Sequence, residues 1–244
     1  MRGVGAETRL SLWVAATCRE GIALVTDSAA QPNLGRVMAA IEDGAPLPAT
    51  IVEKTYFLSA AQVHIAVCGS LKIDLSQGWP SPDRLTGGPT DFEGALEAIR
   101  AQVATGEIIE PTAFDLAVVG FDGHCPRLAR VSPSGIEIAV GDQVFLGGFA
   151  KLYRSALVLE PPLNLTQCLG GALGFAAIAL LDYEAPEDRL PAISYPLHLL
   201  VWRAGRGIEP ERELITAELM YGALQRANTA IERKSVTTQE GISA

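Results

Sequence analysis

Residues 9–28, RLSLWVAATCREGIALVTDS, contain the strongest structural signal in the chain. Two apolar runs rich in β-branched residues flank a short polar stretch, residues 18–21, which is typical of a β-hairpin. Both runs are more continuously apolar than a strand with one face in water would be. We therefore expect two strands of a sheet that is covered on both faces.

Short apolar runs bounded by turn residues predict seven more strands downstream of this hairpin. They are, in chain order, Ile51–Leu58, Val63–Cys68, Phe114–Phe121, Arg127–Ser132, Ile136–Val140, Val144–Leu146 and Ser194–Arg203. Turn residues such as Asp122-Gly123 separate them.

Three stretches predict helices. Asp91 is a typical N-cap, apolar residues recur at helical spacing after it, and Gly106 follows as a stop. A second helix is predicted from about Leu165 to Tyr183 and is apolar on all sides, as a helix buried in a larger assembly would be. A third is predicted over Glu209–Lys234. The order of strands and helices predicts an α+β fold in which two antiparallel sheets carry helices on their outer faces.

Composition and charge narrow the class of protein. The 244 residues include 28 acidic and 19 basic side chains, a net charge of −9, and the basic residues are scattered, so we expect no nucleic-acid partner. The longest uncharged apolar run, residues 169–181, is shorter than the roughly 20 residues needed to cross a bilayer. The first ten residues have no apolar core of a secretory signal. We expect a cytoplasmic protein without a membrane partner: one domain over 11–234, an N-terminal extension over 1–10 and a flexible tail over 235–244.

The sequence contains no motif that is typical of a metal or cofactor site. The four cysteines lie far apart in the chain, so there is no CxxC pair, and the three histidines form no HExxH motif. We therefore expect neither a metal site nor a cofactor.

Four stretches together resemble a proteasome-type subunit of the N-terminal-nucleophile (Ntn) hydrolase superfamily. They are GIALVTDS at 21–28, IVEKTYFL at 51–58 with VHIAVCGS at 63–70, DLAVVGFD at 115–122 with CPRLARVSPSG at 125–135, and the last two predicted helices around a strand. The resemblance spans nearly the whole chain. It implies a four-layer αββα sandwich of two antiparallel sheets.

The resemblance also implies a mechanism and candidate catalytic residues. In this family, self-cleavage exposes a threonine whose hydroxyl attacks a peptide carbonyl while its own α-amine moves the proton. Carried over to this sequence, the carboxylate is Asp27, the lysine is Lys54 and the oxyanion glycine is Gly69. The family spacing to the aspartate places the nucleophile at Ser11, where this chain has serine instead of threonine.

Three positions depart from the family pattern. Leu10 stands where self-cleaving members usually have glycine, Gly147 stands where a supporting serine is expected, and the supporting aspartate falls near Ala185. Each candidate also has a plain structural interpretation. Ser11 is then a strand residue, Asp27 ends a strand, Lys54 is an outward charge on an edge strand and Gly69 terminates a strand.

The geometry of the first hairpin leaves two alternatives open. With a three-residue loop, residues 18–20, Asp27 lies across from Ser11. With a two-residue loop, residues 19–20, Asp27 turns to the opposite face of the sheet.

Two functions follow from these observations. In one, the protein hydrolyses peptide or small amide bonds with Ser11 after self-processing; in the other, it keeps the fold and is a noncatalytic structural or binding protein. We also expect self-association into a homo-oligomer, because the helix around residues 169–181 is apolar on all sides.

Overall fold

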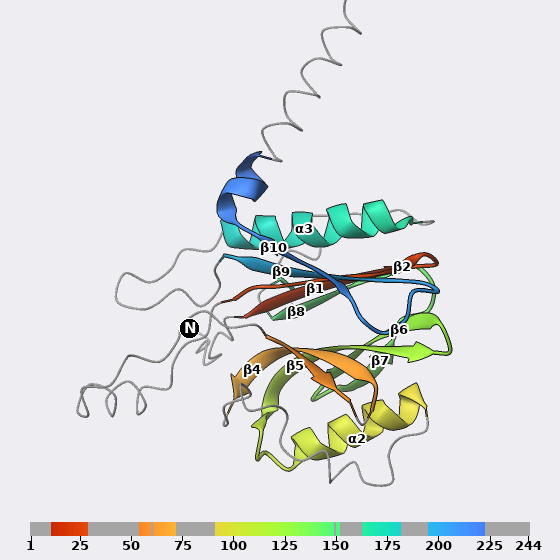
Figure 1. Cartoon of the computed structure of the whole chain (residues 1–244). Coiled ribbons are helices and arrows are strands. Elements are labelled where there is room, and N and C mark those ends of the chain that lie inside the picture. The colour runs from red at the N-terminus through yellow and green to blue at the C-terminus, as the bar shows by residue number, and fades with distance from the viewer. Residues whose placement is uncertain are drawn as a thin grey trace, which may run out of the picture.

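The computed structural model describes residues 11–28, 54–59, 61–71, 91–148, 150–151, 163–181 and 195–222 (Figure 1). In chain order, the elements are β1 (Leu12–Cys18), β2 (Gly21–Thr26), β3 (Thr55–Leu58), β4 (Val63–Leu71), α2 (Phe92–Ala104), β5 (Ile109–Asp122), β6 (Cys125–Ser132), β7 (Gly135–Ile138), β8 (Gln143–Gly148), α3 (Leu165–Leu181), β9 (Leu197–Arg203) and β10 (Glu211–Ile215).

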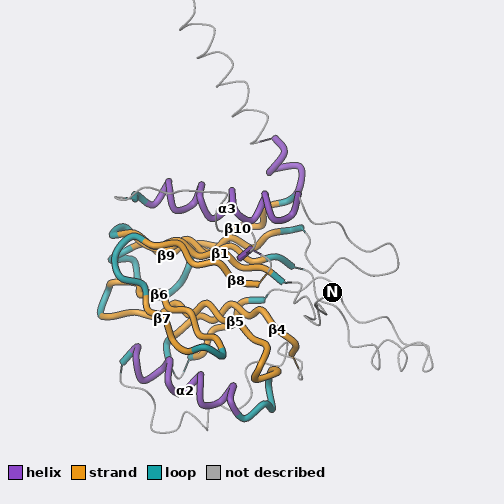
Figure 2. Tube along the Cα trace, turned by 180° about the vertical axis from the view of Figure 1, so that it is seen from behind, coloured by secondary structure: helices purple, strands orange, loops and turns teal. Residues whose placement is uncertain are grey.

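The strands form two antiparallel sheets of five strands each. The first has the order β10-β9-β2-β1-β8 and the second β3-β4-β5-β6-β7. Helix α3 covers the outer face of the first sheet and α2 the outer face of the second, as Figures 1 and 2 show from opposite sides. This is the expected α+β arrangement of four layers, and the fold prediction is confirmed.

Three apolar layers hold the sandwich together. Alternate residues of β1 show the division: Leu12 and Val14 pack toward α3, whereas Trp13 and Ala15 belong to the layer between the sheets. All four are 0% exposed. The apolar run in the sequence is continuous because both faces of this strand are buried.

The first two predicted helices are confirmed. The Asp91 carboxylate accepts a hydrogen bond from Gly94 N at 2.8 Å and caps α2, and Gly106 follows with φ 70°. Helix α3 begins at Leu165 as predicted. No helix in the described part of the chain is both long and apolar enough to cross a membrane.

The third predicted helix is wrong at its beginning. Residues Glu211–Ile215 form β10, which pairs with β9 in register from Glu211↔Val201 to Ile215↔Leu197. Of the described residues in this stretch, 217–222 are helical. Ile215 is buried and residues 211–214 are exposed, and β10 is an edge strand of its sheet. These residues pair with β9 and do not form the helix that the spacing of their apolar residues suggests. Gly205 and Gly207, with φ 80° and 89°, turn the chain back so that it lies beside β9. The predicted residues 223–234 lie outside the described part.

The first hairpin has the shorter of the two possible loops. Cys18 pairs with Gly21, so Arg19 and Glu20 alone form the turn. Gly21 has φ 156°, and a Cβ there would lie 2.0 Å from Trp202 O of the neighbouring β9. Close approach of β9 therefore requires glycine at this position.

Candidate active site

Ser11 lies directly before β1, at one end of the central strands of the first sheet. The next residue, Leu12, pairs with Gly148 of β8 on one side. On the other side, its carbonyl accepts a hydrogen bond from Asp27 N at 3.3 Å. Two neighbouring strands therefore fix the backbone next to Ser11.

Lys54 connects Ser11 with Asp27. Its Nζ donates to Ser11 Oγ at 2.7 Å and to the two carboxylate oxygens of Asp27 at 2.9 and 2.8 Å. The Lys54 side chain is 8% exposed and that of Asp27 is 0% exposed. Burial of either charge alone would be costly, so the pair accounts for the presence of both.

The lysine reaches this site from the second sheet. Lys54 directly precedes β3, and its carbonyl accepts a hydrogen bond from Val67 N of β4 at 3.1 Å. Ser11 and Asp27 belong to the first sheet. The three side chains thus meet where one end of the first sheet faces the second.

The two-residue loop was expected to turn Asp27 away from Ser11, and that expectation is wrong. Leu12 N donates to Asp27 Oδ1 at 2.9 Å, so the side chain occupies the place that a backbone carbonyl holds in a regular ladder. The strand ends at Thr26, and the strict alternation of faces ends with it. The Asp27 carboxylate therefore points to Lys54 and accepts hydrogen bonds from its Nζ.

Gly69 lies on β4, two residues beyond the residue that bonds to the Lys54 backbone. Its φ is 149°, and a Cβ would lie 2.6 Å from Ile109 Cδ1 and 2.8 Å from Ala113 O. Packing alone thus requires glycine here. Strand β4 continues through Gly69 to Leu71 with a shift of register between them, so Gly69 does not terminate the strand.

A buried thiol lies next to this group. Cys68 is 1% exposed, and burial raises the pKa of its thiol well above the ordinary value. The charge of Lys54 opposes this rise in pKa, while the charges of Asp27 and Asp115 add to it. The raised pKa favours the neutral form of the Cys68 thiol over the thiolate. Within the described ranges, no group of three or more His, Cys, Asp or Glu side chains could hold a metal ion.

The position of the missing supporting serine is filled by another side chain. A Cβ at Gly147 would lie 2.0 Å from Cε2 of Trp13, so the indole occupies the space that a serine would need. The neighbouring Gly148 has φ 57°, and a Cβ there would lie 1.9 Å from Ser11 O. Both glycines are required by close packing at the start of β1. Ala185 lies outside the described residues.

No protein-family model and no curated protein matches this sequence. Solved structures do match. Anbu (ancestral beta-subunit) from Yersinia bercovieri aligns with a TM-score of 0.61 and 16% identity over 93% of this chain and 97% of that one. Anbu from Hyphomicrobium sp. strain MC1 aligns with a TM-score of 0.60 and 13% identity over 93% and 97% of the two chains, and its Gly-1 mutant with 0.60 and 15% over 93% and 96%. The chain has a proteasome-like fold.

These neighbours correct the family suggested by the sequence motifs. The expectation was a proteasome-type subunit, whereas the structures found are Anbu proteins, which are proteasome-like but form a distinct family. At 13–16% identity, the likeness shows the fold alone. Function must be argued from this chain's own residues.

Proposed function

We propose that this protein hydrolyses peptide or small amide bonds, with Ser11 as the nucleophile after self-cleavage exposes it. One observation carries the proposal: Lys54 Nζ lies 2.7 Å from Ser11 Oγ while both oxygens of the buried Asp27 hold the ammonium in place. The fold alone does not require a serine, a lysine and a carboxylate in contact, so their contact supports a catalytic role.

The chemistry begins with the bond between Leu10 and Ser11. Ser11 Oγ attacks the Leu10 carbonyl carbon, the acyl group moves from nitrogen to oxygen, and water then hydrolyses the ester. The products are residues 1–10 and a chain that begins with the free α-amine of Ser11. That amine is the base which a serine hydroxyl needs, since a free hydroxyl is a weak nucleophile.

Lys54 has two roles in the subsequent hydrolysis of substrate. Its hydrogen bond orients Ser11 Oγ, and its positive charge favours the negative charge that develops on that oxygen. A nearby ammonium also lowers the pKa of an amine by like-charge repulsion, which keeps the α-amine of Ser11 able to accept a proton. Asp27 holds Lys54 and, through Leu12 N, the backbone beside the nucleophile.

Intact mass spectrometry tests this proposal. The wild-type protein is expected to yield a species that lacks residues 1–10, and Ser11→Ala is expected to remain full length. Ser132→Ala is the control, because Ser132 is a buried serine at the end of β6 in the other sheet, and its hydroxyl shares a hydrogen bond with that of Ser134. Cleavage at the same bond in Ser11→Ala would exclude Ser11 as the nucleophile.

A second candidate function is that of a noncatalytic structural or binding protein with this fold. The observation in its favour is Trp13, whose indole fills the place of a supporting hydroxyl at Gly147. Wild-type protein that stays full length, with Ser11 unreactive toward hydroxyl-directed reagents, would favour this candidate over the hydrolase.

Self-association is part of the same proposal. Helix α3 has the sequence LTQCLGGALGFAAIALL, without a charged side chain, although it forms an outer layer of the sandwich. The Yersinia bercovieri protein with this fold is itself described as a beta-subunit. We expect a homo-oligomer in light scattering at micromolar concentration, and a monomer would contradict this part.

A further inference from the structure

Asp115 is a second buried carboxylate, outside the group formed by Ser11, Lys54 and Asp27. It belongs to β5 in the second sheet, lies between Phe114 and Leu116, and is 3% exposed. A carboxylate in such a place is costly unless it is paired and hydrogen-bonded. Its partners show what it holds.

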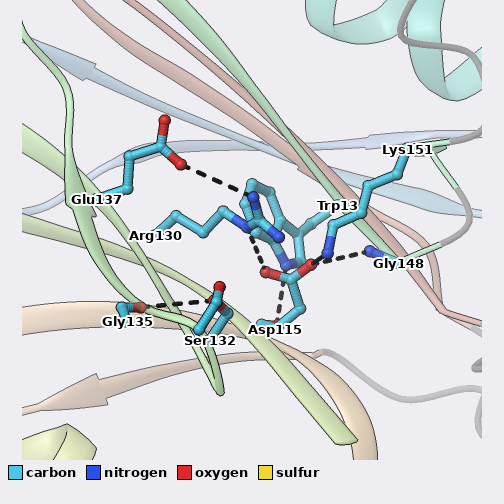
Figure 3. A network of polar contacts seen from close by, with 9 residues as sticks. Trp13, Asp115, Arg130, Ser132, Gly135, Glu137, Gly148 and Lys151 are labelled. Atoms are coloured by element: carbon cyan, nitrogen blue, oxygen red, sulfur yellow. Dashed lines mark hydrogen bonds and ion pairs between the residues drawn. The ribbon is translucent and has the colours of Figure 1, made fainter.

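Four groups converge on Asp115 (Figure 3). Its Oδ1 accepts from Arg130 Nε at 2.8 Å, and its Oδ2 accepts from Gly148 N at 3.4 Å and contacts Lys151 Nζ. Its backbone carbonyl accepts from Trp13 Nε1 at 3.0 Å. Arg130 comes from the same sheet as Asp115, whereas Trp13 and Gly148 come from the opposite sheet.

The two partners in the opposite sheet are the segments that hold Ser11. Trp13 follows Ser11 by two residues on β1, and Gly148 is the cross-strand neighbour of Leu12 on β8. Gly148 also lies against Ser11 itself, since a Cβ on Gly148 would be 1.9 Å from Ser11 O. Strand β1, which follows the nucleophile, and its neighbour β8 therefore both bond to one residue of the second sheet.

On its own sheet, Asp115 lies beside β4, the strand that bonds to the backbone of Lys54. It pairs with Cys68 across β4 and β5, and the residue before Cys68, Val67, donates its N–H to the Lys54 carbonyl. The chain of contacts thus runs from Lys54 through β4 to Asp115, and from Asp115 across the sandwich to the backbone of Ser11.

We propose that Asp115 is a positioning residue that holds Ser11 Oγ within hydrogen-bond distance of Lys54, an inference that rests on the proposed function. It ties the sheet that carries the nucleophile to the sheet that carries the lysine. A displacement of about 1 Å at a reacting atom can lower a rate by on the order of 10²-fold. Loss of the Asp115 contacts between the sheets is expected to lower the rate of the Ser11 reaction by a similar factor, although Asp115 itself does not touch substrate.

The charge of Asp115 has a separate consequence. It neutralises Arg130 and Lys151, whose side chains are 23% and 41% exposed. Without it, Arg130 and Lys151 lose this partner, and the positive charge of Lys151 acts on Cys68 as that of Lys54 does. The exposed Glu137 stays 3.8 Å from Arg130 Nη1. Added positive charge favours loss of the proton that must leave before Ser11 Oγ can attack, so modification of Ser11 should begin at lower pH.

The test compares Asp115→Asn with Asp122→Asn. Asp122 lies on the same strand, but its side chain is 77% exposed and faces Arg127 at 3.7 Å. The first readout is the rate at which a fluorophosphonate modifies Ser11, measured from pH 6 to 10. The second is NMR of the ¹⁵N-labelled lysine side chains, of which the chain has only four, with Lys54 assigned from a Lys54→Met spectrum.

In Asp115→Asn, we expect Ser11 modification to be on the order of 10²-fold slower at its optimum. Its pH midpoint should move to lower pH, and the Lys54 ammonium signal should shift or exchange faster with water. Asp115→Asn/Lys151→Gln removes one unpaired cation and should move the pH midpoint back, an effect that a merely structural role would not produce. Asp122→Asn should match the wild type in every readout.

Each result decides between the two proposals. Wild-type rate and an unchanged Lys54 signal in Asp115→Asn overturn the positioning role. If the wild type is not modified at Ser11 but the Lys54 signal moves only in Asp115→Asn, the proposed reaction fails and the positioning role stands. If Asp115→Asn does not fold, Trp13→Phe replaces it in the test. This variant removes the hydrogen bond that the Asp115 backbone carbonyl accepts from Trp13 Nε1 and keeps an aromatic ring. Modification of Ser11 should then be about tenfold slower, and the Lys54 signal should shift. An unchanged Trp13→Phe protein then overturns the role.

Discussion

Lys54→Met should destabilise the protein far more than loss of a surface charge. The substitution keeps an unbranched apolar chain of similar length but removes the ammonium that contacts both Asp27 oxygens and Ser11 Oγ. The Asp27 carboxylate, 0% exposed, is left without its cation in an apolar interior. The dominant cost is therefore an uncompensated buried charge.

The expected loss in the free energy of unfolding is about 3–5 kcal/mol, the usual range when one partner of a buried ion pair is removed. The lower half of that range fits best, because Leu12 N still donates to Asp27. Asp27→Asn/Lys54→Met removes both charges, so the double variant should lose about 2 kcal/mol less than the sum of the single losses.

Urea unfolding followed by tryptophan fluorescence measures these differences, since Trp13 and Trp202 lie in the layer between the sheets at 0% exposure. Arg127→Met is the control, because its ion pairs with Glu93 and Asp122 are exposed and should contribute about 1 kcal/mol or less. A loss below that of the control, or simple additivity in the double variant, would refute the coupling between Lys54 and Asp27.

Two further predictions concern packing and pH. Gly147→Ser should destabilise by about 1–3 kcal/mol in urea unfolding, because its Cβ would lie 2.0 Å from the Trp13 ring; unchanged stability would mean that the indole can move aside. Burial, together with the hydrogen bond that the Cys168 thiol donates to Cys18, raises the pKa of the Cys168 thiol from 9.0 to about 12. The unfolded thiol ionises first, so its stabilising effect is complete below pH 9 and is lost as pH rises toward 12. Between pH 8 and 10 the wild type should lose about 1.4 kcal/mol more than Cys168→Ala, and equal losses would contradict burial of a neutral thiol.

The layers of the fold follow from the sequence wherever a strand is buried on both faces. Residues 12–16 of β1 and 22–25 of β2 are apolar at every position because α3 lies on one side of these strands and the second sheet on the other. The prediction was wrong at residues 211–215, where apolar residues at helical spacing continue into residues 217–222. Residues 211–215 form a strand because they pair with β9, and the sequence of these residues alone does not reveal that they have this partner.

The candidate site was predicted only in part. Family spacing proposed Ser11, Asp27 and Lys54 as candidates, and in the structure Lys54 Nζ contacts the other two side chains. Asp115 was passed over, although a carboxylate in an otherwise apolar strand is a signal that it has a partner. Its bond with Trp13 joins residues 102 positions apart, and no local spacing reveals such a contact.

The reactivity of Ser11 tests the central claim most directly. Wild-type protein treated with a fluorophosphonate and mapped by peptide mass spectrometry should carry a single adduct on the peptide of residues 11–19, at Ser11, and Ser11→Ala should carry none. An unmodified wild type, or an adduct on another serine that persists in Ser11→Ala, would contradict Ser11 as the nucleophile.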